Sequence, residues 1–159
     1  KKNKDYFVKK YFEPVIQIKL TKELFKFANS SIDISDGLID DLEKMINKQK
    51  LSYKIWEEQI PISRNLNNYL KRSDLKKTNF ISNGDDYQIL FTASTDKSRI
   101  VESTSKRLGI KISKIGKISR NSEKSSIINQ KGEHLLVKNT GYKHQFYLKK
   151  IQIWNLLKI

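Results

Sequence analysis

The sequence predicts a mixed α/β sandwich in which one sheet packs against helices. Apolar residues recur at helical spacing between positions 38 and 46, as expected for one buried helix face. Residues 51–55 instead alternate apolar with polar side chains, which is typical of a half-buried strand. Residues 87–93 form a third apolar segment that is rich in strand-forming residue types. Helices interleaved with strands in this way favour the mixed sandwich.

The first elements along the chain are expected to be a linker, a helix and a strand. Residues 1–14 are charged and aromatic and end at Pro14, so we interpret them as a linker. Residues 21–28 follow as a short helix, which Asn29-Ser-Ser31 closes. A brief strand in residues 32–38 then runs into the amphipathic helix described above.

The elements after this helix follow from turn and capping signals. Beyond the strand at 51–55, Pro61 interrupts the pattern and residues 64–70 are expected to form a helical turn or two. The turn Ser82-Asn-Gly-Asp85 precedes the strand at 87–93.

The last elements are predicted as a helix, a strand and a hairpin. Asp96 is a suitable cap for a helix that continues to Leu108, and Gly109 then ends it. Residues 111–118 alternate lysine or serine with isoleucine and therefore predict a strand. The final pair of strands is expected to form a hairpin around Lys131-Gly132, with its arms at residues 125–129 and 134–137.

The composition narrows the class of protein. The net charge is +15, but arginine supplies only five of the 32 basic residues, whereas proteins that read nucleic acids favour the planar fork of arginine. We therefore expect no specific nucleic-acid partner. The chain contains no cysteine, which excludes disulfides and thiolate metal sites and fits the reducing cytoplasm. No apolar run reaches the roughly 18 residues that a membrane span requires, so no span is expected.

The segment Asp33-Ile-Ser-Asp-Gly-Leu38 is the first candidate site. Asp33 and Asp36 flank a strand-to-helix turn, with Ser35 between them. The N–H groups at a helix N-terminus can hold an anion, and two carboxylates at one turn can hold Mg²⁺ together with phosphate oxygens. This arrangement suits a metal-bridged polyphosphate. The structural alternative is that Ser35 or Asp36 caps the helix and that Asp40-Asp41 are ordinary first-turn acids.

Two further segments carry candidate functional residues. Gly84-Asp-Asp-Tyr87 combines a glycine, which permits close backbone approach, with adjacent carboxylates that can bind a cation or a cationic ligand. The alternative is an Asn-Gly-Asp turn between elements. In Gly141-Tyr-Lys-His144, Tyr142 could stack on a flat heterocycle or could anchor the core.

Together these segments resemble the motifs of the thiamine-monophosphate kinase family. Residues 30–42 closely match its Asp-Ile-Ser-Asp-Gly-Leu signature, and residues 83–92 stand in the place of its Gly-Gly-Glu/Asp-Asp-Tyr stretch. Residues 141–146 resemble the Gly-Tyr-Asp-His-Phe with which the family ends. The three motifs occur in the family's order and spacing, and the resemblance covers residues 6–146.

The resemblance implies a reaction and a set of site residues. The family's enzymes transfer the γ-phosphoryl group of ATP onto the phosphate of thiamine monophosphate, which gives thiamine diphosphate. By this resemblance Asp33 and Asp36 are Mg²⁺ ligands, Ser35 contacts ATP, Asp85 contacts thiamine monophosphate and Tyr142 packs on that substrate. Phosphoryl transfer depends on positioning and on cations rather than on a nucleophilic side chain, so no catalytic side chain is assigned.

The resemblance also implies a fold and an assembly. The chain would be the C-terminal domain of a member of the aminoimidazole ribonucleotide synthetase superfamily, an α+β, three-layer α/β/α sandwich with a mixed sheet that is partly ferredoxin-like. We expect residues 1–14 to be a linker, residues 15–146 the C-terminal kinase-type domain and residues 147–159 an apolar, basic tail. The expected partner is the N-terminal, ATP-binding half of the same enzyme, with a homodimer at full length. The lone chain is expected to be inactive.

Other functions stay open on the sequence alone. The chain could be another ATP-using enzyme of the same superfamily, or a non-catalytic module that binds phosphate or thiamine phosphate. Asn83, Gln88, Lys143 and Gln145 depart from the family's motifs, and Asn83 and Gln145 do so on the substrate side. The tail is expected to pack on the body, with a membrane surface or a protein partner as the alternatives.

Overall fold

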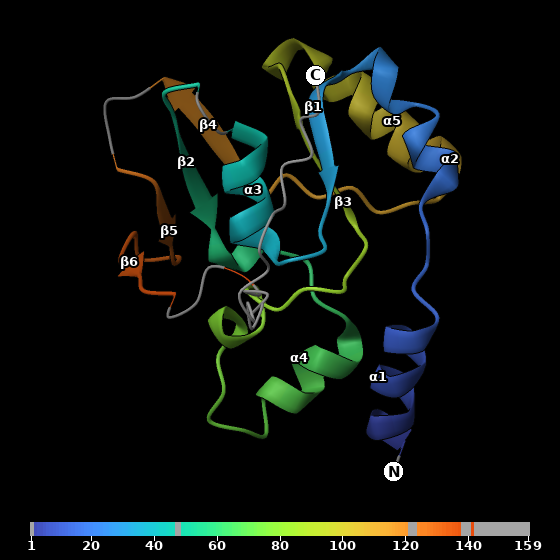
Figure 1. Cartoon of the computed structure of the whole chain (residues 1–159), viewed down its shortest axis with the longest axis vertical. Helices are drawn as coiled ribbons and strands as arrows, with labels where there is room; N and C mark the ends of the chain where they lie inside the picture. Colours follow the sequence, from blue (N-terminus) through green and yellow to red (C-terminus); the bar gives the residue numbers. More distant parts are fainter. Residues whose placement is uncertain (1, 47–48, 121–123, 138–140, 142–159) are drawn as a thin grey trace, which may run out of the picture.

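The computed structural model describes residues 2–46, 49–120, 124–137 and 141, which form a mixed α+β fold (Figure 1). The helices of this part are α1 (Lys2–Phe12), α2 (Ile18–Thr21), α3 (Leu38–Ile46), α4 (Arg64–Leu70) and α5 (Ser98–Leu108). Its strands are β1 (Ala28–Asp33), β2 (Leu51–Trp56), β3 (Ile89–Ala93), β4 (Gly116–Arg120), β5 (Ser126–Ile128) and β6 (His134–Leu135). Four 3₁₀ turns connect them, η1 (Leu24–Lys26), η2 (Glu57–Gln59), η3 (Lys77–Asn79) and η4 (Thr95–Lys97).

The strands form two sheets. β1 and β3 pair antiparallel in a two-stranded sheet, with Asp33 opposite Ile89. The second sheet has the order β4-β2-β5-β6, in which β2 runs antiparallel to β4 and parallel to β5, and β5 runs antiparallel to β6. This sheet is therefore mixed, as the sequence analysis expected.

Helix α3 lies between the two sheets in Figure 1 and contributes most to the shared core. Its predicted apolar face is confirmed, because Leu38, Leu42 and Ile46 are buried. They belong to one cluster with Ile55 on β2 and Leu90 on β3. Burying a side chain of this size contributes about 1.5–3 kcal/mol, so α3 is the element that ties one sheet to the other.

The predicted elements differ from the structure at the N-terminal end. Residues 1–14, interpreted as a linker, contain the helix α1. The helix predicted at residues 21–28 is wrong in its bounds, since α2 begins at Ile18 and β1 already begins at Ala28. The reason is tertiary pairing, because Ala28 lies opposite Ala93 at the end of the β1–β3 ladder.

Two further differences concern α5 and β4. Asp96 lies within η4 instead of capping α5, whereas Gly109 ends that helix with a left-handed φ of 64°, as predicted. The strand predicted at residues 111–118 begins only at Gly116, whose partner is Ile55 close to the end of β2. Alternating isoleucines cannot extend a ladder beyond the strand they pair with.

The predicted hairpin is confirmed, with Ile128 of β5 opposite His134 of β6 and Gly132 at a φ of 79° in the connection. Within the described part of the chain, no helix has both the length and the apolar character needed to cross a membrane.

Candidate functional site

The turn between β1 and α3 is built around the buried carboxylate of Asp41. Asp41 is 1% exposed, and its Oδ2 accepts hydrogen bonds from the N–H groups of Ser35 and Asp36 at 2.9 Å and of Gly37 at 3.2 Å. A carboxylate from the first turn of α3 thus reaches back and satisfies the N–H groups of the turn that leads into the helix. This set of bonds fixes the turn that carries Ser35 and Asp36.

These contacts change the interpretation of the helix N-terminus. The sequence suggested that its N–H groups are open to an external anion, but those of Ser35, Asp36 and Gly37 bind the chain's own Asp41. The N–H of Leu38 donates to the carbonyl of Ile81 at 3.0 Å. Asp41 is therefore an internal anion and not an ordinary first-turn acid.

Three carboxylates gather at the start of α3. Oxygen atoms of Asp36, Asp40 and Asp41 all lie within 4.8 Å of one another. The ammonium of Lys44 pairs with Asp36, with Asp40 at 2.7 Å and with Asp41 at 3.1 Å. We call these three aspartates the acidic cluster. One lysine therefore faces every carboxylate of the cluster.

The electrostatics of the cluster follow from these contacts. The hydrogen bond to Asp36, followed by that to Asp40, raises the pKa of Lys44 well above its ordinary value. Burial by itself raises the pKa of Asp41, but the hydrogen bonds from the backbone and from Lys44 outweigh it, so the pKa of Asp41 is lowered. Both groups are held in their charged forms at neutral pH.

The donor set of the acidic cluster fits Mg²⁺, which prefers carboxylate oxygens and commonly uses one or two of them. Asp36 and Asp40 keep part of their side chains in solvent, whereas Asp41 already uses one oxygen for the backbone. Among the described residues, Asp33, the other ligand predicted from the sequence, lies outside this group at the exposed end of β1. Sequence reasoning did not single out Asp40 as a ligand, although its spacing from Asp36 was a signal.

The loop before β3 packs directly on the β1–α3 turn. The N–H of Asp85 donates to the carbonyl of Ser35 and the N–H of Tyr87 to that of Ile34, both at 2.9 Å. A Cβ atom at Gly84 would lie 1.9 Å from the carbonyl oxygen of Ser35, so only glycine allows this contact. The predicted close approach at Gly84 exists, and its partner is the chain's own turn.

This loop has an unusual backbone. Asp85 and Tyr87 both adopt positive φ values, 64° and 49°, a region that bulky residues rarely occupy. The hydroxyl of Tyr87 donates to Asp85 at 3.2 Å, and this bond raises the pKa of Tyr87. The pKa of Asp86 is also raised, because protein atoms reduce the water around it and because Asp85 is close. Strain and shifted pKa values of this kind tend to occur at functional sites.

The first residue of the third motif, Gly141, lies beside the β1–α3 turn. A Cβ atom at Gly141 would lie 2.4 Å from Cβ of Asp40 and 3.0 Å from the carbonyl oxygen of Asp36. Gly141 therefore rests on the start of α3. Tyr142, the predicted substrate contact, lies outside the described residues. The structure thus brings the first two motifs and the first residue of the third together at one corner.

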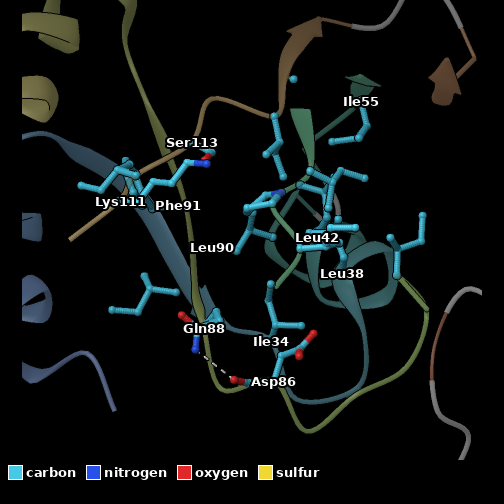
Figure 2. A pocket seen from close by; sticks show the side chains of 18 of the residues that line it. Ile34, Leu38, Leu42, Ile55, Asp86, Gln88, Leu90, Phe91, Lys111 and Ser113 are labelled. Carbon is cyan, nitrogen blue, oxygen red and sulfur yellow. Dashed lines mark hydrogen bonds between the residues drawn. The ribbon is translucent and has the colours of Figure 1, made fainter. Parts of the chain in front are cut away.

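A large cleft opens beside this corner, between the two sheets. Figure 2 shows Ile34, Leu38 and Leu42 among the residues that line it, with Leu90 and Asp86 from β3 and its preceding loop. Its volume of about 2490 Å³ exceeds the roughly 300–1,000 Å³ of a typical ligand pocket. The cleft is therefore too open to enclose one small molecule by itself.

Comparison with known proteins finds similarity to thiamine-monophosphate kinases. No protein-family model matches the chain. The thiamine-monophosphate kinase of Buchnera aphidicola subsp. Schizaphis graminum is 31% identical over 140 residues, which are 88% of this chain and 43% of the relative. The thiamine-monophosphate kinase of Escherichia coli strain K12 is 28% identical over 143 residues, with 90% and 43% covered.

Solved structures agree with these relatives. The crystal structure of thiamine-monophosphate kinase from Stenotrophomonas maltophilia K279a is 27% identical with a TM-score of 0.61, and the match covers 77% of this chain and 37% of that one. AaThiL complexed with AMPPCP and TMP shares the fold at 22% identity, with a TM-score of 0.70 and coverage of 91% and 43%. The chain spans less than half the length of the relatives it matches. The family resemblance seen in the motifs is thereby confirmed, and the chain is a homologue of the thiamine-monophosphate kinases over most of its own length.

Proposed function

We propose that this chain supplies the C-terminal part of a thiamine-monophosphate kinase. The complete protein would transfer the γ-phosphoryl group of ATP to the phosphate of thiamine monophosphate. The observation that carries this proposal is the meeting of the first two motif segments with Gly141, the first residue of the third, at the start of α3, where Gly84 touches Ser35 and Gly141 touches Asp40. The identity to kinases of this name supports it.

The roles proposed for the residues follow the motifs. Asp33 and Asp36 would hold Mg²⁺, Ser35 would contact ATP, and Asp85 and Tyr142 would contact thiamine monophosphate. Asp85 is suited to this role because its backbone is fixed beside Ser35 at 2.9 Å. The two substrates would therefore meet across the contact between the two loops.

The chemistry proposed at this corner is one of positioning. Bound Mg²⁺ would offset the negative charge of the facing phosphates. The chain itself contributes rigid backbone, because Asp41 fixes the β1–α3 turn and the Asp85 N–H joins that turn to the second loop. Errors of about 1 Å in such positions can slow a reaction roughly a hundredfold.

The remaining parts of the proposal concern the complete protein. Residues 15–146 would be the C-terminal kinase-type domain, a three-layer, partly ferredoxin-like sandwich, with the linker at 1–14 and the tail at 147–159. The partner would be the N-terminal half of the same enzyme, and the full-length protein would be a homodimer. We place the reaction in the cytoplasm because ATP is its phosphoryl donor.

The test compares the lone chain with a fusion in which the N-terminal half of the Buchnera relative precedes it. We expect no measurable thiamine diphosphate from the lone chain and clear formation from the fusion. Asp36→Asn in the fusion should lower turnover by at least about tenfold, since it removes a metal-binding charge, while Asp96→Asn at an exposed site should not.

Each other outcome has a distinct meaning. Turnover by the lone chain would contradict the view that this part is insufficient. A folded fusion that binds thiamine monophosphate without phosphorylating it would favour a non-catalytic module. Phosphorylation of a different acceptor would indicate another enzyme of the superfamily.

A further inference from the structure

The connection between β2 and β3 is long and carries the second motif at its far end. β2 ends at Trp56 and β3 begins at Ile89. Between them the chain passes through η2, α4 and η3 before it reaches the loop that holds Asp85, and α4 lies below both sheets in the view of Figure 1. Ordering a long connection costs conformational entropy. Its last residues therefore keep one position only if contacts fix the chain along the way.

The side chain of Lys77 closes the base of the α4 excursion, residues 61–76. Its ammonium donates to the main-chain carbonyls of Glu57 at 2.7 Å, of Ile60 at 3.2 Å and, more weakly, of Glu58 at 3.4 Å. An ammonium group has three N–H donors, so these carbonyls take up all of them. One side chain thus joins the start of the excursion to its end.

The geometry of this contact suits a lysine. Three carbonyls from the tight turn η2 and its end converge on a single nitrogen atom. A compact ammonium donates in three directions from one atom, whereas the planar guanidinium of arginine spreads its donors in a fixed fork. The positive charge also suits the carbonyl end of a helical turn. Because the contact is part-buried, loss of the ammonium would leave these carbonyls poorly compensated.

Lys77 lies one helical turn away from the contacts that build the site. Its carbonyl accepts the N–H of Ile81 at 3.3 Å, and the carbonyl of Ile81 accepts the N–H of Leu38, the first residue of α3, at 3.0 Å. Ile81 also shares the buried cluster with Ile60. The segment then reaches Gly84, which rests on the β1–α3 turn. Lys77 therefore ties the second motif to the end of β2, whereas the later contacts tie it to α3.

We propose that Lys77 is a positioning residue, whose ammonium fixes the connection that carries Asp85 and so sets where this carboxylate meets its substrate. The inference rests on the proposed function only for the identity of that substrate. Lys77 itself acts through the main chain, because every contact of its ammonium described above is made to a backbone carbonyl.

The test is amide hydrogen exchange of this chain, followed residue by residue by nuclear magnetic resonance. In Lys77→Met the N–H groups of Asp85 and Tyr87, which bond to the β1–α3 turn, should exchange at least about tenfold faster, because the loop opens more often. The N–H groups of the β2–β4 ladder should change by less than about twofold. Lys76→Met is the matched control, since Lys76 is the exposed neighbour whose main-chain N–H donates to Asn79.

Two results of this measurement would overturn the proposal. The first is unchanged exchange at Asp85 and Tyr87. The second is an equal acceleration in the loop and in the β2–β4 ladder, because Lys77 would then serve only the stability of the whole fold.

A chemical rescue separates the charge of Lys77 from its stem. The chain contains no cysteine, so Lys77→Cys introduces a single thiol. Alkylation of the unfolded variant with 2-bromoethylamine before refolding restores an ammonium on a stem close to the length of lysine, whereas bromoethane adds a neutral ethyl group. The ammonium product should exchange at Asp85 as slowly as the unaltered chain, and the ethyl product as fast as Lys77→Met.

The rescue has two contrary outcomes. Equal exchange at Asp85 in the two alkylated products would show that the ammonium is not what fixes the loop. Failure of both Lys77→Met and the ethyl product to fold would also overturn the proposal, because Lys77 would then hold the entire fold and not one connection.

A kinetic measurement in the fusion described above tests the consequence for the substrate. Lys77→Met should raise KM for thiamine monophosphate at least about fivefold and leave KM for ATP within about twofold, because Asp41 holds the turn of Ser35 independently. An equal rise in both constants would contradict an effect through Asp85. The exchange measurements use no substrate, so a fusion without kinase activity would overturn the proposed function and leave their result standing.

Discussion

Asp41 shows how one buried carboxylate can organise a turn that is itself exposed. Its Oδ2 accepts three backbone N–H groups, from Ser35, Asp36 and Gly37. Unpaired, those N–H groups would cost roughly 1–3 kcal/mol each if buried. The residue contributes to the site through the conformation of its neighbours.

The lowered pKa of Asp41 predicts a dependence of stability on pH. Because the pKa is lower in the folded chain than in the unfolded one, where it is near 3.8, the ionised carboxylate stabilises the fold above that value. This contribution is lost as the pH falls through the folded pKa. Asp41→Asn should therefore reduce the free energy of unfolding at pH 7 by about 2 kcal/mol and should flatten its acid dependence.

Denaturant unfolding between about pH 2 and pH 7 measures this effect, within the range where carboxylates titrate. Asp96→Asn is the matched control, because Asp96 is 70% exposed and its ion pair with Lys97 is long, at 3.9 Å. An acid dependence that is the same in both variants would contradict the role assigned to Asp41.

The residues of the site could be predicted from the sequence only in part. The motifs indicated Asp36 and Ser35, because both lie in a recognisable strand-to-helix turn. They did not separate Asp41 from Asp40, since neighbouring acids in a first turn have the same pattern. Which of the two is buried depends on the helix face, and α3 turns Asp41 toward the core.

At the scale of elements, the contact between the β1–α3 turn and the loop before β3 holds the two motif segments together. It consists of the Asp85 and Tyr87 N–H bonds and of the glycine that lets the backbones meet. The strand pair β1–β3 continues this contact, with Asp33 opposite Ile89. The two motif segments thus continue from the same end of one short antiparallel ladder.

Gly84→Ala tests this contact. The new methyl group would lie 1.9 Å from the Ser35 carbonyl oxygen, so the loops must separate, and we expect a loss of about 2–3 kcal/mol in the free energy of unfolding. Gly132→Ala is the control, because nothing lies within 4 Å there and only its φ of +79° is unfavourable, at about 1 kcal/mol. Thermal and denaturant unfolding measure both variants. A loss of stability in Gly84→Ala no larger than that in Gly132→Ala would show that the contact is dispensable.

Local patterns predicted the elements best where the chain pairs with what lies next to it in sequence. Helix α3 and the hairpin of β5 with β6 were both expected. Residues 111–115 were not predicted correctly, because the ladder with β2 begins only at Gly116, opposite Ile55, and the preceding residues reach β2 only through the bond from the Trp56 N–H to the Ile115 carbonyl. The division into two sheets likewise depends on pairing between distant segments.

At the scale of the whole molecule, large apolar side chains remain exposed toward the N-terminal end. Phe12 is 75% exposed and Ile16 is 59% exposed, and Val8, Tyr11 and Val15 are further exposed apolar residues of α1 and of the segment that follows it. A run of large exposed apolar side chains is typical of a segment that another surface covers. The chain spans only 43% of the Buchnera relative, and the N-terminal half proposed above as its partner would be a suitable cover for these side chains.

This surface predicts the behaviour of the lone chain. We expect it to bind an apolar dye such as anilinonaphthalene sulfonate and to self-associate in sedimentation velocity. Phe12→Ser with Ile16→Ser should lower dye binding at least about twofold. Leu136→Ser should change little, because Leu136 is 94% exposed but is remote in sequence from this region. Dye binding that falls only in the Leu136 variant would contradict the assignment.

The position of Gly141 against Asp40 also bears on when the site comes into existence. A ribosome makes this chain from its N-terminus, so β1, α3 and the loop that contains Gly84 emerge long before Gly141 does. Contacts between such distant segments form late and slowly during folding. A nascent chain can therefore join the first two motifs while the corner still lacks its third side. The corner is therefore complete only after the chain has been made as far as Gly141, because this residue closes it against Asp40.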